Sequence, residues 1–255
     1  MRHRRSIQSI ALLALLLLAS CRPDAPTSAP SRTPGSTAAA PAAPLPAAAP
    51  WFERIPPVSG LDFVHSAGST GKFLMPEMET GGVGLIDFDQ DGLLDVFCVD
   101  GGSVDPALPK APGHRLFRNL GNARFEDVTR QAGIVVPDGF GMGCAVGDFD
   151  GDAWPDLYVT QLGVNRLFRN RRDGTFEDVT LKAGVAVRSW STSAAFVDYD
   201  ADGHLDLFVV NYIRWSPSIE MECFSHGGRR DYCSPVNYRA PAPTVLLRNR
   251  CNGTF

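Results

Sequence analysis

The sequence lacks the features that mark several common classes of protein. No window outside the first 20 residues shows sustained helical periodicity, which argues against a helical bundle. Basic residues are not in excess, because 24 Lys and Arg stand against 28 Asp and Glu, for a net charge of −4. We therefore expect no nucleic-acid partner, which would require a basic face. The G-x-S-x-G, H-E-x-x-H and P-loop motifs are also absent, and we expect no enzymatic activity and no catalytic residues.

Residues 1–20 have the order of features typical of an export signal. A basic stretch, residues 2–5, precedes the apolar run Ile10 to Leu18, which is too short to span a bilayer comfortably. The run ends in Leu18-Ala19-Ser20-Cys21, which resembles a bacterial lipobox and implies lipidation of Cys21 after cleavage. We therefore expect an exported cell-envelope lipoprotein, on the outer membrane or cell surface, that contacts the membrane through this lipid. The alternatives are a signal peptide with an incidental cysteine and an uncleaved anchor.

Residues 21–50 contain almost only Ala, Pro, Ser and Thr, without periodicity and with hardly any large apolar side chain. Such a segment buries too little surface to offset its conformational entropy, so we predict a disordered tether. The folded repeat region is expected at 51–255.

Three segments of this region align with one another, at residues 82–97, 143–158 and 193–208. Each is followed by an apolar pair and Arg-Asn, and F-E-D-V-T comes next at 125–129 and 176–180. Short apolar or alternating runs bounded by Gly, Asp and Asn indicate about four strands in each unit of roughly 50 residues. This pattern predicts an all-β fold of β-propeller blades. A β-sandwich is the alternative, but sandwiches do not repeat a loop motif in register.

The phase of the repeat suggests an incomplete ring. Phe52 to Ile55 matches the start of F-E-D-V-T, so we expect the region to open on the last strand of a unit. The sequence stops at Asn252-Gly253-Thr254-Phe255, where another such strand would begin. We expect three units of a larger propeller, in an N-terminal fragment.

The most specific motif is an Asp-rich loop with carboxylates at positions 1, 3, 5 and 9. The three copies occupy residues 87–95, 148–156 and 198–206. Their carboxylates are Asp87, Asp89, Asp91 and Asp95 in the first, Asp148, Asp150, Asp152 and Asp156 in the second, and Asp198, Asp200, Asp202 and Asp206 in the third. Like charges about 4 Å apart repel by roughly 1 kcal/mol in water and about 4 kcal/mol in a partly screened site, so each group needs a cation or extensive solvation.

Calcium fits this donor set best, because it takes six to eight hard oxygen ligands in flexible geometry. A backbone carbonyl at position 7 would complete each set, from Leu93, Trp154 and His204. The flanking strands and the Asp at position 9 distinguish the loop from an EF-hand. The second loop departs most from the pattern, since Ala153 takes the usual Gly place and Pro155 precedes the last Asp.

These motifs together resemble a known family. The Asp loops, L-F-R-N and D-G-T-F-E-D-V-T resemble FG-GAP (VCBS-type) repeats, as in the propellers of integrin α-subunits. The closer resemblance is to ASPIC/UnbV proteins of the cartilage-acidic-protein-like family, which the residues 60–65 and 230–235 also share. The resemblance implies a seven-bladed, calcium-binding propeller of which about three blades are present.

Five cysteines remain besides Cys21. Cys223 and Cys233 lie in a long insertion, Tyr212 to Pro243, and we favour a disulfide between them because export permits one. The odd number leaves at least one thiol unpaired within the chain. We expect a calcium-binding, surface-anchored binding or adhesion module with a protein or glycan ligand. The alternative is a non-catalytic part of an exported enzyme whose active site lies in missing blades.

Overall fold

The computed structural model describes residues 52–105, 113–136 and 139–255. The chain divides into two units, Met1–Trp51 and Phe52–Phe255. The predicted signal peptide, the tether and the lipidated Cys21 all fall in the first unit, outside the described residues. Among the residues that are described, no helix is long and apolar enough to cross a bilayer.

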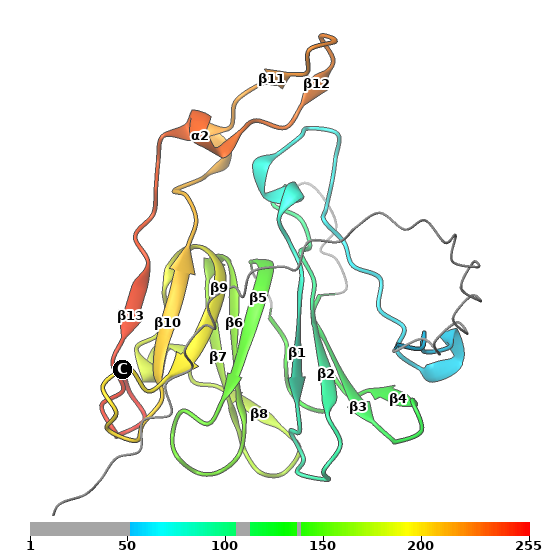
Figure 1. Cartoon of the computed structure of the whole chain (residues 1–255), viewed down its shortest axis with the longest axis vertical. Coiled ribbons are helices and arrows are strands. Elements are labelled where there is room, and N and C mark those ends of the chain that lie inside the picture. Colours follow the sequence, from blue (N-terminus) through cyan, green and yellow to red (C-terminus); the bar gives the residue numbers. More distant parts are fainter. Residues whose placement is uncertain (1–51, 106–112, 137–138) are drawn as a thin grey trace, which may run out of the picture. The chain divides into compact units, whose positions relative to one another are not determined.

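The first repeat forms a four-stranded antiparallel sheet in which each strand pairs with the next along the chain (Figure 1). Its strands are β1 (Gly82–Ile86), β2 (Asp95–Val99), β3 (Arg115–Asn119) and β4 (Phe125–Asp127). The first Asp loop joins β1 to β2, and β4 carries the start of F-E-D-V-T. This order is that of a propeller blade, and the predicted all-β fold is confirmed.

The second and third repeats repeat the blade. The strands of the second are β5 (Phe140–Gly147), β6 (Asp156–Val164), β7 (Arg166–Asn170) and β8 (Phe176–Asp178), followed by the short helix α1 (Thr180–Ala183). Those of the third are β9 (Arg188–Val197), β10 (Asp206–Asn211) and β13 (Val245–Leu247). The beginning of β9 also pairs with the end of β6, so these two blades form one seven-stranded sheet. The described residues form three blades and no closed ring.

A long insertion separates β10 from β13 and lies at the upper end of the blades in Figure 1, away from the Asp loops. It contains η3 (Pro217–Ile219), β11 (Cys223–Phe224), β12 (Arg230–Asp231) and α2 (Pro235–Tyr238). A disulfide joins Cys223 to Cys233, the pair that the sequence favoured. Two short 3₁₀ helices, η1 (Pro57–Ser59) and η2 (Met75–Met78), precede β1. The predicted opening strand at Phe52–Ile55 is wrong, because those residues are exposed and pair with no strand in the structure.

The core lies between blades, where alternate residues of each strand face opposite neighbours. In β6, Leu157 and Val159 join a buried cluster with β2, whereas Tyr158 between them joins a cluster with β10. Successive side chains of a strand point to opposite faces of the sheet, so neighbouring residues of β6 pack against different blades. An aromatic pair also bridges the first two blades: the ring centroids of Phe88 and Phe176 lie 6.1 Å apart. Two hydrophobic layers of the same design therefore hold the three blades together.

Candidate metal centre

Each Asp loop connects the first two strands of its blade and gathers three carboxylates. One oxygen from each lies within 4.8 Å of the others. The three groups are Asp87, Asp89 and Asp95; Asp148, Asp150 and Asp156; and Asp198, Asp200 and Asp206. These are positions 1, 3 and 9 of the predicted loops, so the hairpin geometry brings together residues up to eight positions apart.

The carboxylate at position 9 anchors each loop, because its side chain is fully buried in all three loops. In the second loop, Asp156 accepts one hydrogen bond from the backbone N–H of Phe149 at 3.0 Å and another from Asn170 at 2.8 Å. The other two loops repeat both bonds. Two charge-assisted bonds hold this carboxylate in place next to the other acidic groups.

The carboxylate at position 1 closes the turn by accepting the backbone N–H of position 6. In the first loop Asp87 accepts it from Gly92 at 3.1 Å through Oδ2. Its Oδ1 is buried and has no hydrogen-bond partner in the described structure, and the same holds for Oδ1 of Asp89 and of Asp150. A buried carboxylate oxygen without a donor is costly, and a bound cation is the ordinary way to satisfy it. The first two loops therefore have the donor set and the unsatisfied oxygens that a hard metal ion requires.

Burial and mutual repulsion make Asp95, Asp150 and Asp156 difficult to ionise without such an ion. Burial, and after it the charges of Asp150 and Asp152, raise the pKa of Asp156 to about 8 against two lowering backbone hydrogen bonds. Burial likewise raises the pKa of Asp95 to about 6. The pKa of Asp150 is raised by burial and by its neighbouring Asp side chains. A divalent cation would favour the ionised forms.

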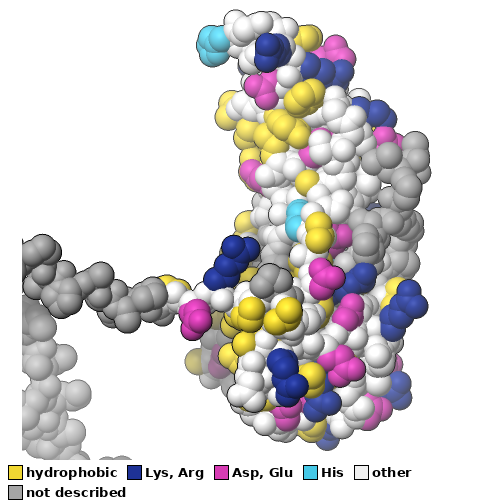
Figure 2. Space-filling view, turned by 90° about the vertical axis from the view of Figure 1, so that its right-hand side faces the viewer, with side chains coloured by type: hydrophobic (Ala, Val, Ile, Leu, Met, Phe, Trp, Pro, Cys, Tyr) yellow, Lys and Arg dark blue, Asp and Glu magenta, His cyan; other side chains and the backbone are white. Residues whose placement is uncertain are grey.

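The carboxylates at position 5 lie outside these groups and face arginines. Asp152 accepts the N–H of Trp154 at 2.9 Å and pairs with Arg172 at 2.7 Å. Asp91 and Asp202 accept the equivalent N–H and lie 3.6 and 3.4 Å from Arg118 and Arg248, the Arg of L-F-R-N in the first repeat and of L-L-R-N in the third. Carboxylates and basic groups accordingly lie side by side over the lower part of the face in Figure 2, the end with the Asp loops. Ligation by position 5, and by the carbonyls of Leu93, Trp154 and His204, stays a prediction.

A family description of FG-GAP-like repeats matches residues 87–159 and 157–209, a range that contains all three Asp loops. The chain carries FG-GAP-like repeats. It is also 31% identical over 127 residues to cartilage acidic protein 1 of Homo sapiens, covering 48% of this chain and 19% of that protein. To cartilage acidic protein 1 of Xenopus tropicalis it is 35% identical over 74 residues, or 28% of this chain and 11% of the other. The chain thus spans about a fifth or less of the length of these curated relatives.

Each FG-GAP repeat also contains an asparagine whose role the sequence did not reveal. The Asn of L-F-R-N donates its backbone N–H to the position-9 Asp and its side-chain N–H to the carbonyl of position 8. In the second and third repeats the same amide reaches the preceding blade. Asn170 Nδ2 lies 2.8 Å from the carbonyl of Phe88, and Asn249 Nδ2 lies 2.7 Å from that of Phe149. In the second and third repeats, this Asn therefore connects the Asp loop of its own blade to the Asp loop of the preceding blade.

Replacing Asn170 by alanine should destabilise the protein by about 1–3 kcal/mol, because the buried carbonyl of Phe88 loses its donor. Asn119→Ala is the matched control, since Asn119 makes the same bonds within its blade but no recorded bond to another blade. Urea unfolding monitored by circular dichroism measures both variants. Equal losses of unfolding free energy in the two variants would mean that the hydrogen bond between blades contributes nothing to stability.

Positions 4 and 6 of every loop have left-handed backbone conformations, which favour glycine. The first and third loops place Gly92 and Gly203 at position 6, whereas the second has Ala153 there with φ of 68°. Ala153→Gly should therefore stabilise the protein by about 1 kcal/mol, and Gly92→Ala should destabilise it by a similar amount. An alanine at Gly92 would meet no atom within 4 Å, so its cost comes from the backbone alone. Thermal unfolding of both variants tests this pair, and shifts of the same sign would contradict it.

Proposed function

We propose that the chain is a calcium-stabilised binding or adhesion module. The observation that carries the proposal is that each of the three blades has a group of three Asp carboxylates at the same position. In two of these groups, buried carboxylate oxygens have no hydrogen-bond donor among the described residues. FG-GAP-like repeats and the similarity to cartilage acidic protein 1 support a binding role. Calcium would cross-link the residues of each hairpin and relieve the repulsion among them.

The same proposal places the module outside the cell. The lipobox-like Cys21 would anchor it to the envelope, and the tether at 21–50 would hold the blades away from the membrane. Its partner would be a protein or a glycan. We propose binding and not catalysis, because the carboxylates that could act as acid and base are those committed to the metal.

Thermal unfolding of the full chain in a calcium titration tests the proposal. A site that binds only the folded state adds about 2.7 kcal/mol at a ligand concentration 100 times its Kd, so the melting temperature should rise with calcium and fall again with chelator. Magnesium should give a smaller shift because it demands stricter octahedral geometry.

A triple variant, Asp87→Asn, Asp148→Asn and Asp198→Asn, should lose the calcium response while Asp231→Asn keeps it. Asp231 is a suitable control because it is an exposed carboxylate on the insertion, outside the three groups. An unchanged melting temperature across the titration would refute the calcium role.

A further inference from the structure

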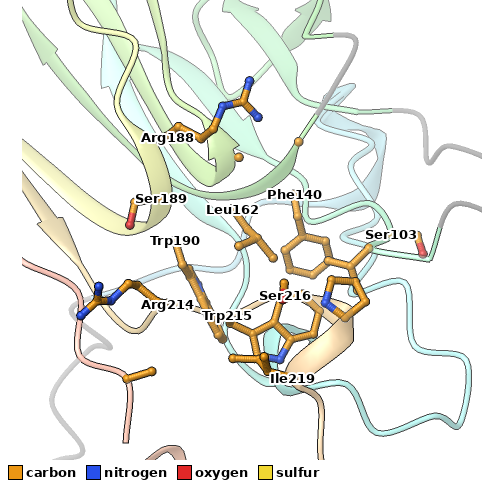
Figure 3. Close-up of a pocket in the computed structure, with 15 residues that line it drawn as sticks. Ser103, Phe140, Leu162, Arg188, Ser189, Trp190, Arg214, Trp215, Ser216 and Ile219 are labelled. Carbon is orange, nitrogen blue, oxygen red and sulfur yellow. The ribbon is translucent and has the colours of Figure 1, made fainter. Parts of the chain in front are cut away.

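A second candidate site lies at the opposite end of the blades from the Asp loops. A cavity of about 770 Å³ opens where the insertion meets the beginnings of β5 and β9 and the end of β6 (Figure 3). This volume is within the range of pockets that hold small organic ligands. The Asp loops connect the other ends of the same strands, so the cavity shares no residue with them.

The wall of the cavity is mainly aromatic and aliphatic. Phe140 and Trp190 are almost completely buried and belong to one hydrophobic cluster, against which Leu162 and Trp215 pack. The rings of Trp190 and Trp215 lie 6.2 Å apart at 72° to each other. Such surfaces offer apolar area against which a flat ring can pack.

Hydrogen bonds to Glu220, behind the wall, hold the wall in place. Glu220 accepts hydrogen bonds from Nε1 of Trp215 at 2.8 Å and from the backbone N–H of Met75 at 2.9 Å, and it also bonds the hydroxyl of Tyr238. These bonds tie η2 to the insertion across 145 residues of sequence. The aromatic wall is therefore formed before a ligand arrives, which lowers the entropic cost of binding.

The two charged side chains among the described residues that line the cavity are both basic. Arg188 and Arg214 lie on different sides of the aromatic cluster in Figure 3. The guanidinium of Arg188 has no ion pair or hydrogen bond to any described residue, and that of Arg214 has one hydrogen bond, from Nε to the carbonyl of Pro241. Among the described residues that line the cavity, none is a carboxylate that could neutralise the two charges. An anionic group on the ligand would fill this role.

We propose that this pocket binds a small organic anion with a flat apolar ring, such as an aromatic carboxylate. The ring would lie against Trp190, Trp215 and Leu162, and the carboxylate would face Arg188. An anionic group would gain a charge-assisted hydrogen bond to the exposed guanidinium that a neutral ring cannot make, and a cation would be repelled. The inference rests on the proposed function only in making the chain a binding module, and it does not depend on calcium in the Asp loops.

Calorimetric titration of the calcium-treated full chain with three indoles tests the proposal. Indole-3-acetate, tryptophol and tryptamine carry the same ring with a negative, a neutral and a positive side group. Indole-3-acetate should bind saturably at one site, tryptophol about tenfold more weakly, and tryptamine not at all. No saturable binding of indole-3-acetate, or equal binding of all three compounds, would overturn the proposal.

Two variants locate the site. Arg188→Gln should weaken the binding of indole-3-acetate about tenfold, whereas Arg250→Gln, an exposed arginine beyond β13, should leave it unchanged. Ile219→Glu places a negative charge on a lining residue that is 41% exposed, so the variant should fold and bind the anion less well. Binding that survives both pocket variants would show that the anion binds elsewhere. Because the calcium test measures melting and this one measures ligand binding, either proposal can fail alone.

Discussion

Replacing Phe97 by alanine should lower the free energy of unfolding by about 3–5 kcal/mol, the usual cost of truncating a fully buried Phe. Phe97 lies on β2 with none of its side chain exposed, in one cluster with Leu157 and Phe168 of the next blade. The change would open a cavity in the hydrophobic layer between the first two blades. Urea or thermal unfolding measures the loss.

Phe208 provides the matched control because it occupies the same position of the third blade. Its side chain is 40% exposed, since no described blade covers that side of β10. Phe208→Ala should therefore cost clearly less than Phe97→Ala, at about 1 kcal/mol. Similar losses for both residues would contradict the assignment of the core to the layers between blades.

Without calcium, the protein should lose stability as the pH rises from about 4 to about 8. Asp156 has a folded-state pKa of about 8, raised by burial and neighbouring charges, and Asp95 has one of about 6, whereas an aspartate in the unfolded chain has its ordinary pKa of 3.8. Between the two values the folded state binds more protons than the unfolded state, so the free energy of unfolding falls with rising pH. Below pH 4 both states are protonated, and above pH 8 both are ionised, so the dependence should level off.

Calcium should remove this loss, because a cation at the loops favours the ionised carboxylates and releases their protons. Melting temperatures across the pH range, in chelator and in saturating calcium, measure the difference. Asp156→Asn should flatten the dependence in chelator, whereas Asp231→Asn, at an exposed carboxylate of the insertion, should leave it unchanged. A metal-free protein whose stability rises over the same pH range would contradict the geometry of the acidic groups.

The sequence was sufficient for the features that repeat. Because the Asp loop, the L-F-R-N strand and F-E-D-V-T recur in register, the sequence predicted about four strands in each unit, and each of the first two repeats has four. The pairing of Cys223 with Cys233 was also within reach, since both lie in one insertion of little regular pattern. The sequence pattern within one unit therefore predicts features that form within that unit, such as its strands and its disulfide.

Contacts between units could not be predicted in the same way. Nothing in the sequence indicated that the side chain of Asn170 reaches the carbonyl of Phe88 in the preceding blade. That contact depends on how one blade packs on another, and spacing along the chain carries no information about it. The error at Phe52–Ile55 has the same origin, because a strand motif forms a strand only beside a partner. The residues that line the pocket come from the insertion and four other segments, and they contain no repeated motif.

Calorimetric counting of bound calcium is the most direct test of the central claim, that the Asp loops are metal sites. The metal-stripped full chain should bind three calcium ions, with one site lost in each of the single variants Asp87→Asn, Asp148→Asn and Asp198→Asn. A chain that binds no calcium, or whose stoichiometry is unchanged in all three variants, would contradict the claim.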